Sequence, residues 1–360
     1  MDVMRVIKPP LSSTIQDEGR SIGMAQGVPP SGSCDLFSYR LNNLVLGNPP
    51  GSGVLEIAAQ GGDIELLADC VIAVTGAELS FTLQGKCLPL GEPVYARKGD
   101  LLSAGSCRRG TYAYLGISGG IDGSIALGSR STYTVGMLGG LEGRRLASGD
   151  VLTRDRDPEP LLPIAGAGDL AREMSEPPKE IRIVPGPQEK YFDSESYETL
   201  VRDYFRVSNR SDRMAFRLLG PAPVCAEVPR TADTGSGPTD IVEEGNPVGG
   251  IQVAGGAELI CLGRDCGTSG GYAKIGTVIE PDLSRMAQLV PNDQFTFELV
   301  DVGAAAAARA AAERQLEDVA SLGEMNGHLG TGFTALVGAA WSDSAGPTNA
   351  ARPAHDRPNS

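Results

Sequence analysis

Residues 54–83 read VLEIAAQGGDIELLADCVIAVTGAELSFTL, a run of short apolar segments separated by turns that contain glycine. The segments predicted as strands are 54–59, 64–67, 71–75 and 79–83. Residues 79–83 alternate apolar and polar side chains, as a half-buried strand requires, because neighbouring side chains point to opposite faces of a sheet. This stretch predicts a mainly β protein.

The same pattern continues on both sides of this stretch. Further strands are predicted at 3–7, 112–117, 181–184, 249–262 and 275–279. Glycine makes up 48 of the 360 residues, roughly twice average usage. Many glycines lie in short clusters without a collagen-like period, and such clusters suit turns because glycine tolerates positive φ. A chain so rich in turns and short strands is typical of a barrel or sandwich.

Glycine-Asp turns precede apolar pairs at 98–102 and at 148–152, and residues 291–297 resemble both. This faint internal similarity is consistent with two related β modules. We predict an N-terminal module at 1–153, a linker at 154–179, a second module with a terminal helix at 180–322, and a flexible tail at 323–360. The linker is chosen for its prolines, which stop strands and helices alike. The alternative that the tail packs against the rest of the chain stays open, because it contains four large apolar residues: Phe333, Leu336, Val337 and Trp341.

A few helices are also expected. The clearest covers 35–46, where Asp35 or Ser33 can cap the start and Gly47 suits the end. Residues 188–204 look helical in part, and 283–289 form a plausible short helix. Residues 302–320 are rich in Ala, Arg and Glu, which are strong helix formers.

Composition excludes several classes of partner and site. The chain carries 31 basic and 45 acidic residues, a net charge of −14, which disfavours nucleic acid. It has no polybasic run to attract an anionic membrane surface and no apolar stretch near the ~18 residues that cross a bilayer. The seven cysteines form no CxxC pair and no apolar signal segment opens the sequence. We therefore expect free thiols and a cytoplasmic location.

Histidine gives the sharpest restriction on the chemistry. Only His328 and His355 are present, and both lie beyond the last convincing core segment. A Ser-His-Asp triad, a Cys-His dyad and a histidine-rich metal site are all disfavoured, and no metal site is predicted. Any chemistry must use carboxylates, Arg, Lys, Tyr, hydroxyls and backbone amides.

Several motifs in one order give the chain a family resemblance. They lie at 14–20 (TIQDEGR), 27–29, 31–35, 42–48, 128–132 (GSRST), 211–214 (SDRM), 250–253 (GIQV) and 268–272 (TSGGY). Over about residues 1–320 the chain resembles the KipA-like family, which includes the C-type subunit of 5-oxoprolinase and allophanate hydrolase subunit 2 and is related to biotin-dependent carboxyltransferases. The resemblance implies two cyclophilin-like β-barrel modules. The chain departs from the family pattern at Ala215, Ala254, Cys266 and Gly267.

The resemblance also implies a set of site residues. Four acids are expected to orient an amide or water: Asp17, Asp35, Asp212 and Asp265. The expected substrate-binding residues are Arg20, Ser129, Arg130, Ser131, Arg213, Gln252, Tyr272 and Lys274. In this set the arginines steady anionic groups, and residues 128–132 offer amides and hydroxyls to an oxyanion or carboxylate.

Each motif also has a purely structural interpretation. Residues 17–20 can be a charged turn, and Asp35 can simply cap the helix that follows it. Residues 128–132 can be a polar loop. Asp212 and Arg213 can form an internal ion pair, and 268–272 can be a hairpin turn rather than a lid over a substrate.

The resemblance implies one subunit of an ATP-dependent 5-oxoprolinase. It would be active with a KipI-like partner, the B-type subunit of that enzyme, with room for a third protein of the A type. ATP is assigned to the complex rather than to this chain. One alternative is a carboxyltransferase subunit for urea- or allophanate-like amides, with carboxybiotin carried by another protein, since no Ala-Met-Lys-Met-type acceptor is present. Another is a non-catalytic regulator that binds a KipI-like kinase inhibitor.

Overall fold

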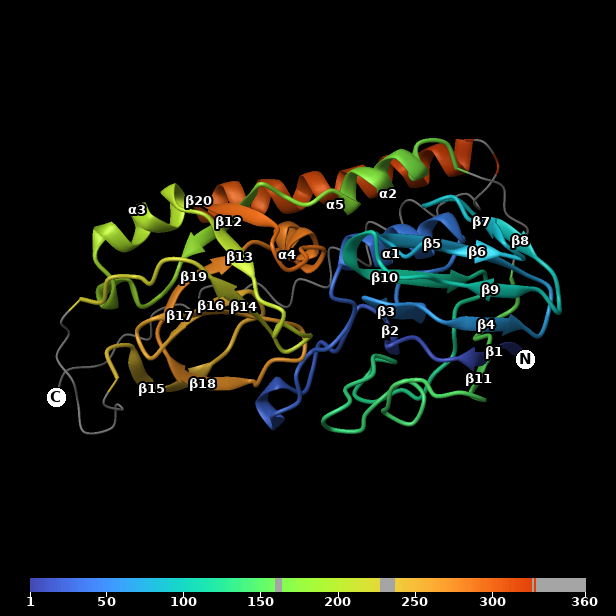
Figure 1. The fold of residues 1–360 in the computed structure, drawn as a ribbon, viewed down its shortest axis with the longest axis horizontal. Coiled ribbons are helices and arrows are strands. Elements are labelled where there is room, and N and C mark those ends of the chain that lie inside the picture. Colours follow the sequence, from blue (N-terminus) through green and yellow to red (C-terminus); the bar gives the residue numbers. More distant parts are fainter. Residues whose placement is uncertain (159–163, 227–236, 326, 328–360) are drawn as a thin grey trace, which may run out of the picture.

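The computed structural model describes residues 1–158, 164–226, 237–325 and 327. Two β-rich modules lie side by side, and a long C-terminal helix, α5 (Val302–Met325), runs along one side of both (Figure 1). All seven cysteines are free thiols. Among the described residues, none of the helices combines the length and apolar character needed to span a membrane.

The first module contains two sheets. One has six strands in the order β11 (Val151–Thr153), β1 (Asp2–Lys8), β4 (Asp63–Leu66), β9 (Leu101–Ser103), β6 (Thr82–Leu83) and β7 (Lys86–Cys87). The other has five strands in the order β2 (Ser12–Gln16), β3 (Val54–Ala58), β10 (Arg109–Ile117), β5 (Cys70–Glu78) and β8 (Val94–Ala96). Aliphatic side chains from both sheets share one buried core, as alternating strands require.

The second module is a closed barrel. Its strand order is β12 (Glu180–Pro185), β19 (Lys274–Val278), β16 (Gly250–Ala254), β17 (Glu258–Leu262), β14 (Ala215–Leu219), β13 (Phe205–Val207) and β20 (Gln294–Leu299). Phe205, Phe295 and Phe297 meet in its core, with ring centroids 5.2 to 6.4 Å apart. A separate two-stranded sheet joins β15 (Asp240–Gly245) to β18 (Ser269–Tyr272). The predicted fold class, mainly β with two barrel-like modules, few short helices and a C-terminal helix, is confirmed, and the closed barrel is the second module.

One predicted strand in the opening stretch, at 79–83, forms only over its last two residues. Strand β5 continues to Glu78, and the chain then turns before the two-residue strand β6. The turn is made at Ser80, whose backbone adopts a left-handed conformation with φ of 49°. A residue in this region cannot continue a strand, so only Thr82 and Leu83 of the predicted segment are in a strand.

Three turns with the same construction precede strands. In each, an Asp carboxylate accepts a hydrogen bond from the backbone N–H three residues earlier. Asp100 binds the N–H of residue 97 at 2.8 Å, Asp150 that of residue 147 at 2.7 Å, and Asp293 that of residue 290 at 3.0 Å. The strands that follow are β9, β11 and β20. The internal similarity in the sequence therefore corresponds to a repeated turn.

The helices are α1 (Leu36–Val45), α2 (Ala167–Ser175), α3 (Ser194–Arg202), α4 (Glu280–Ala287) and α5, with two short 3-10 turns at Met24–Gln26 and Glu189–Tyr191. Helix α4 begins earlier than the predicted 283–289, because a proline occupies its first turn, where no N–H partner is needed. Helix α5 runs past 320, so the first residues of the predicted tail are helical. Residues 328–360, including the four apolar residues singled out above, lie outside the described residues.

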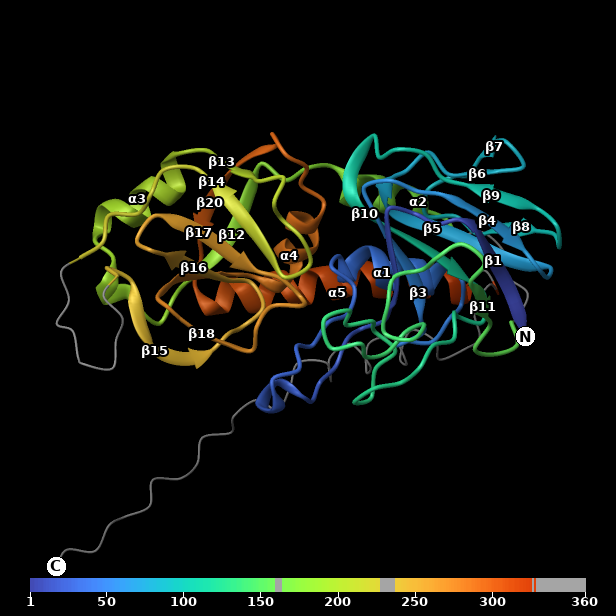
Figure 2. The same cartoon turned by 60° about the horizontal axis from the view of Figure 1, so that its bottom comes forward.

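The predicted linker contains helix α2. Its Ala167 and Ala171 share a buried cluster with α1 and with Leu316 near the end of α5. The prolines at 158, 160 and 163 precede this helix in sequence and those at 177 and 178 follow it, so they border a helix rather than prevent one. Seen from a second direction, α1 and α5 lie close to the boundary between the modules (Figure 2).

The two modules are joined by a shared core. Cys34, Tyr39, Tyr112 and Tyr114 of the first module belong to the same buried cluster as the barrel's interior. Gln288, just after α4, reinforces this contact, because its amide binds the backbone of residues 111 and 112 at 2.8 to 3.3 Å.

Candidate functional site

A cavity of about 330 Å³ lies between the two modules. The first module contributes the segment after β2, with Glu18 and Arg20, and Arg40 of helix α1. The second contributes Arg264, which follows β17, and Glu280 at the start of α4. The volume falls in the range of pockets that hold small ligands. The cavity is therefore the best candidate for a binding site.

Two glycines allow the chain to form one wall of this cavity. Gly19 has φ of +98°, and an added Cβ would lie 2.9 Å from the carbonyl oxygens of Pro30 and Ser31. Gly32 has φ of +88°, and its Cβ would lie 2.8 Å from the carbonyl oxygen of Glu18. Only glycine combines positive φ with such a close approach of two backbone segments. The motifs at 14–20 and 31–35 therefore form one structural unit.

Arg40 is held by acids on both sides. Its guanidinium donates to both carboxylate oxygens of Glu18, at 2.9 to 3.2 Å, and lies 4.0 Å from Glu280. Burial lowers the pKa of Arg40, but the charge and hydrogen bonds of Glu18 and the charge of Glu280 together outweigh it, and the net shift is upward. This charge is compensated within the cavity wall.

Arg264 has no such compensation. It is only partly exposed, yet no hydrogen bond or ion pair of its guanidinium is formed within the described part of the chain. Burial lowers the pKa of Arg264, and the more distant charge of Glu280 opposes that shift. The cavity thus presents one guanidinium without a direct partner.

Asp17 holds the 128–132 loop in place. Its carboxylate accepts hydrogen bonds from the hydroxyls of Ser129 and Ser131, at 2.6 and 2.5 Å, and from the backbone N–H groups of Gly19 and Arg130, at 2.9 and 2.5 Å. The residue is only 5% exposed. Its acceptor positions are occupied by the protein itself, so the geometry ties this carboxylate to a structural task.

The arginines beside this loop are likewise engaged. Arg20 is buried, and its Nε and one Nη donate to the backbone carbonyls of Ala126 and Ser131, whereas its other Nη has no hydrogen-bond partner in the described part of the chain. Burial lowers the pKa of Arg20, and the charge of Asp17 opposes it. The side chain of Arg130 pairs with Asp155 at 2.7 Å. Residues 128–132 therefore form a polar loop braced by ion pairs and hydrogen bonds.

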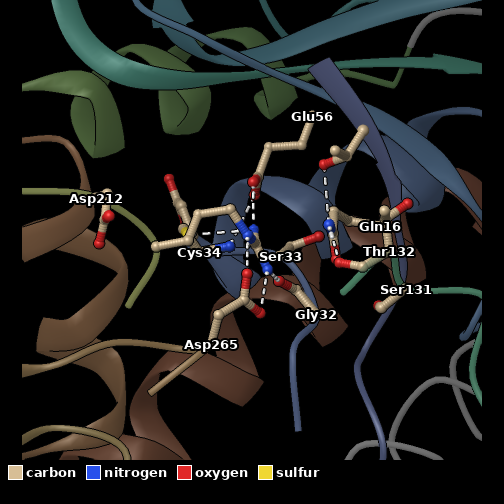
Figure 3. Close-up of polar contacts among 12 residues, drawn as sticks. Gln16, Gly32, Ser33, Cys34, Glu56, Ser131, Thr132, Asp212 and Asp265 are labelled. Carbon is tan, nitrogen blue, oxygen red and sulfur yellow. Dashed lines mark hydrogen bonds and ion pairs between the residues drawn. The ribbon is translucent and has the colours of Figure 1, made fainter. Parts of the chain in front are cut away.

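Arg213 is the centre of a second network, which joins the modules. It donates to Asp265 at 2.8 and 3.2 Å, to the carbonyl of Gly32 at 2.8 Å, and to Glu56 on β3. Figure 3 shows Glu56, Asp265 and Gly32 converging from three segments of the chain. Burial lowers the pKa of Arg213, but the charges led by Asp265 raise it well above its usual value.

Glu56 has further partners that keep it in place. Its Oε2 accepts from the hydroxyl of Tyr114 at 2.9 Å and from the N–H of Cys34 at 2.8 Å. That hydroxyl in turn accepts from the N–H of Asp35 at 2.8 Å. Burial raises the pKa of Tyr114 well above its usual value, so it remains a donor.

Comparison with known proteins identifies the family to which this architecture belongs. Residues 26–299 match the carboxyltransferase domain described as subdomain A and B. The chain belongs to this carboxyltransferase domain family.

Relatives in the carboxyltransferase domain family have two kinds of name. The chain is 33% identical over 302 residues to the urea amidolyase of Saccharomyces cerevisiae, covering 82% of this chain but only 16% of that protein. It is 29% identical over 318 residues to the C-type subunit of the Escherichia coli 5-oxoprolinase, covering 88% of this chain and 98% of that one. The structure of Kluyveromyces lactis urea carboxylase is similar with a TM-score of 0.79 and 32% identity, over 88% of this chain and 29% of that chain.

The four acids predicted from the family resemblance each make a different local contact. Asp35 caps helix α1, accepting from the N–H of Ser38 at 2.9 Å, and burial raises its pKa. Asp212 accepts backbone N–H bonds in an exposed turn and lies apart from the network (Figure 3). The structural alternative of an ion pair between Asp212 and Arg213 is not formed, because Arg213 pairs with Asp265 and Glu56. A catalytic role for any of the four stays a prediction.

The other predicted binding residues lie away from the cavity. Lys274 is buried and pairs with Glu244 on β15 at 2.8 Å. Gln252 is also buried and donates to Asn246 at 3.0 Å. Tyr272 is 39% exposed on β18. Of the twelve predicted residues, only Arg20 lines the cavity.

Sequence reasoning missed Glu56 and Arg264. Glu56 carries a signal, since it is an acid inside the apolar strand VLEIA, and a buried carboxylate needs a partner. No local sequence pattern singles out Arg264, because its lack of a partner depends on which segments of the chain approach it in space. No group of metal-ligating side chains is found within the described ranges.

A larger cavity of about 380 Å³ lies elsewhere, on the first module beside β6 and α2. Its lining is mostly apolar, with Phe81, Leu88 and Leu90, and contains none of the predicted site residues. Size alone therefore does not make it the better candidate for chemistry.

Proposed function

We propose that this chain is one subunit of an amide-handling enzyme complex of the 5-oxoprolinase type, and that the cavity between its modules receives the substrate. The observation that carries the proposal is the correspondence with the C-type subunit of 5-oxoprolinase, which spans 98% of that protein. The matches to urea amidolyase, by contrast, cover only a small part of a much longer chain.

In this reaction, the role of this chain would be to bind and orient the substrate. ATP would phosphorylate the lactam oxygen and release ADP, which makes the ring carbon electrophilic. Water would then add to that carbon and the ring C–N bond would break, with a proton going to the departing amine. A second water would hydrolyse the resulting acyl phosphate to glutamate and phosphate. The ATP for this step is assigned to the complex, because the GSRST loop lacks the lysine and spacing of a Walker A motif. Arg264 and the Arg40–Glu18 pair would position the substrate in the cavity.

The proposal includes a KipI-like partner, with room for a third protein, and a cytoplasmic location that stays a prediction. Exposed apolar side chains suit partner binding. On loops of the first module, Ile22, Val135 and Met137 are 60 to 77% exposed. Met137 also has φ of 52°, a strained conformation for a large side chain. Exposed apolar groups on strained backbone often mark interaction surfaces.

A second candidate is a carboxyltransferase function on urea-like amides. It is favoured by the match to urea amidolyase at 33% identity and by the structural similarity to urea carboxylase. In that case carboxybiotin would be carried by another protein.

The deciding experiment is turnover by the native complex. The tagged chain is purified gently from its own host with its partners, and glutamate formation from 5-oxoproline is followed with and without ATP. A mock purification from an untagged strain controls for contaminating activity. ATP-dependent glutamate release supports the proposal. A stable complex without glutamate release rejects it, and activity with urea and carboxybiotin then supports the second candidate, whereas inactivity with both points to a regulatory binder.

A further inference from the structure

We propose that Arg264 is the specificity-determining residue of the cavity, binding the carboxylate of a small monoanionic amide such as 5-oxoproline. The inference rests on the proposed function for its substrate. It adds that the site recognises the carboxylate of the substrate, which does not follow from the family relationship.

The charged side chains that line the cavity have a net charge of one positive unit, since three arginines face two glutamates. Arg40 is bound bidentately by Glu18 and lies near Glu280, so these charges largely compensate one another. Arg20 is turned toward the carbonyls of the 126–131 loop. Arg264 is left without a direct partner inside the described part of the molecule.

The guanidinium of Arg264 is only partly exposed to water and has no direct protein partner, so its donors are available to a ligand, and a charge partly removed from water gains from pairing. A carboxylate is the group that matches its planar fork, through two parallel N–H···O bonds. A ligand with one negative charge would compensate the wall. Neutral urea would leave the positive charge of Arg264 uncompensated.

The backbone of Arg264 is rigidly held, so its side chain starts from a defined position. Its carbonyl accepts from the N–H of Ser31 at 3.0 Å, across the module boundary. The next residue, Asp265, donates its N–H to the carbonyl of Arg213 at 2.9 Å and binds the guanidinium of Arg213 through its carboxylate. Preorganisation of this kind is what a specific binding group requires.

The remaining wall fits the rest of such a ligand. Leu36, Val248 and Leu283 contribute apolar surface to the same cavity. A lactam ring brings methylene groups that can cover this surface, and burial of apolar area is favourable. Urea has no such groups. A carboxylate at one end and an apolar ring at the other therefore match the cavity better than a small neutral amide.

The test is a calorimetric titration of the full-length chain and of its purified complex. The probes are 5-oxoproline, 2-pyrrolidinone (the same lactam without the carboxylate), urea and freshly prepared allophanate. The variants are Arg264→Gln and Arg264→Lys, with Arg145→Gln as a matched control at an exposed arginine. Thermal unfolding checks that each variant is folded.

We expect Arg264→Gln to weaken 5-oxoproline binding about 10- to 100-fold, as loss of a charged hydrogen-bond pair does. Binding of 2-pyrrolidinone should not change, and Arg264→Lys should fall between the two. Equal weakening for both lactams, no weakening, or no carboxylate binding by chain or complex would overturn the inference.

The arms separate this inference from the proposed function. If allophanate binds better than 5-oxoproline and needs Arg264, carboxylate recognition stands while the 5-oxoprolinase assignment fails. If glutamate is released by the complex and Arg264→Gln leaves KM for 5-oxoproline unchanged, the assignment stands and the role of Arg264 fails.

Discussion

Replacing Arg213 with methionine tests whether the buried ion pairs hold the two modules together. Methionine keeps much of the aliphatic length but removes every hydrogen bond to Glu56, Asp265 and Gly32. The side chains of Arg213, Glu56 and Asp265 are 16%, 3% and 8% exposed, so water can replace little of what is lost. Removing one partner of a buried pair costs about 3–5 kcal/mol, because the other charge stays buried and uncompensated.

The free energy of unfolding is measured from urea denaturation, with the melting temperature as a second reading. For domains of this size, about 3–5 kcal/mol corresponds to a fall in melting temperature of roughly 6–20 °C. Arg217→Met is the control, since Arg217 and Glu258 are each 38% exposed and such surface pairs contribute at most about 1 kcal/mol.

Neutralising the two acids that lose their partner should restore part of the stability. Adding Glu56→Gln and Asp265→Asn to Arg213→Met should recover part of the stability, because it removes the two uncompensated charges. If Arg213→Met costs no more than Arg217→Met, or if the triple variant recovers nothing, the reasoning from the buried network is wrong. If the expected pattern is found, loss of turnover in Arg213→Met reflects a weakened module contact rather than a lost substrate contact.

Three further outcomes are expected. Asp35→Asn should destabilise the protein by about 1–3 kcal/mol in urea denaturation, because one amide oxygen cannot serve both the helix N-terminus and the fixed amide of Gln288; unchanged stability would contradict the capping role. Met137→Asp should leave the isolated chain as stable as before, since Asp tolerates positive φ better, but should reduce co-purification of partner proteins; normal co-purification would show that this loop faces solvent. Alkylation of the folded chain at pH 8, read by peptide mass spectrometry, should label exposed Cys87 and spare Cys266, whose pKa burial raises to about 11; early labelling of Cys266 would show that this region opens.

The positions of most strands could be predicted because their signals are local. Alternation and glycine-bounded apolar runs locate β3, β4 and β5 within a few residues of where they form. The strand predicted at 79–83 is reduced to Thr82 and Leu83 because the left-handed residue Ser80 interrupts it, and serine is not a residue type that indicates such a turn. Helix α2 was hidden between prolines that border it.

The site was predicted as a set of motifs, and the structure reassigned their tasks. Asp17 and Asp35 are side chains that hold a loop and a helix. The sequence allowed a pair between Arg213 and its neighbour Asp212, but the partners of Arg213 are Asp265 and Glu56, 52 and 157 residues away. Such pairings follow from strand order and module docking, which no sequence period encodes.

The sequence by itself determined a mainly β chain with glycine turns, capped helices and an acidic surface, because those features depend on neighbours along the chain. It also determined the family, through motifs in one order. Only the tertiary structure decided that the segments after β2 and β17 face one cavity, that Arg40 is compensated there, and that Arg264 is not. The physical reason is that a charge is satisfied or left over according to distances between segments remote in sequence.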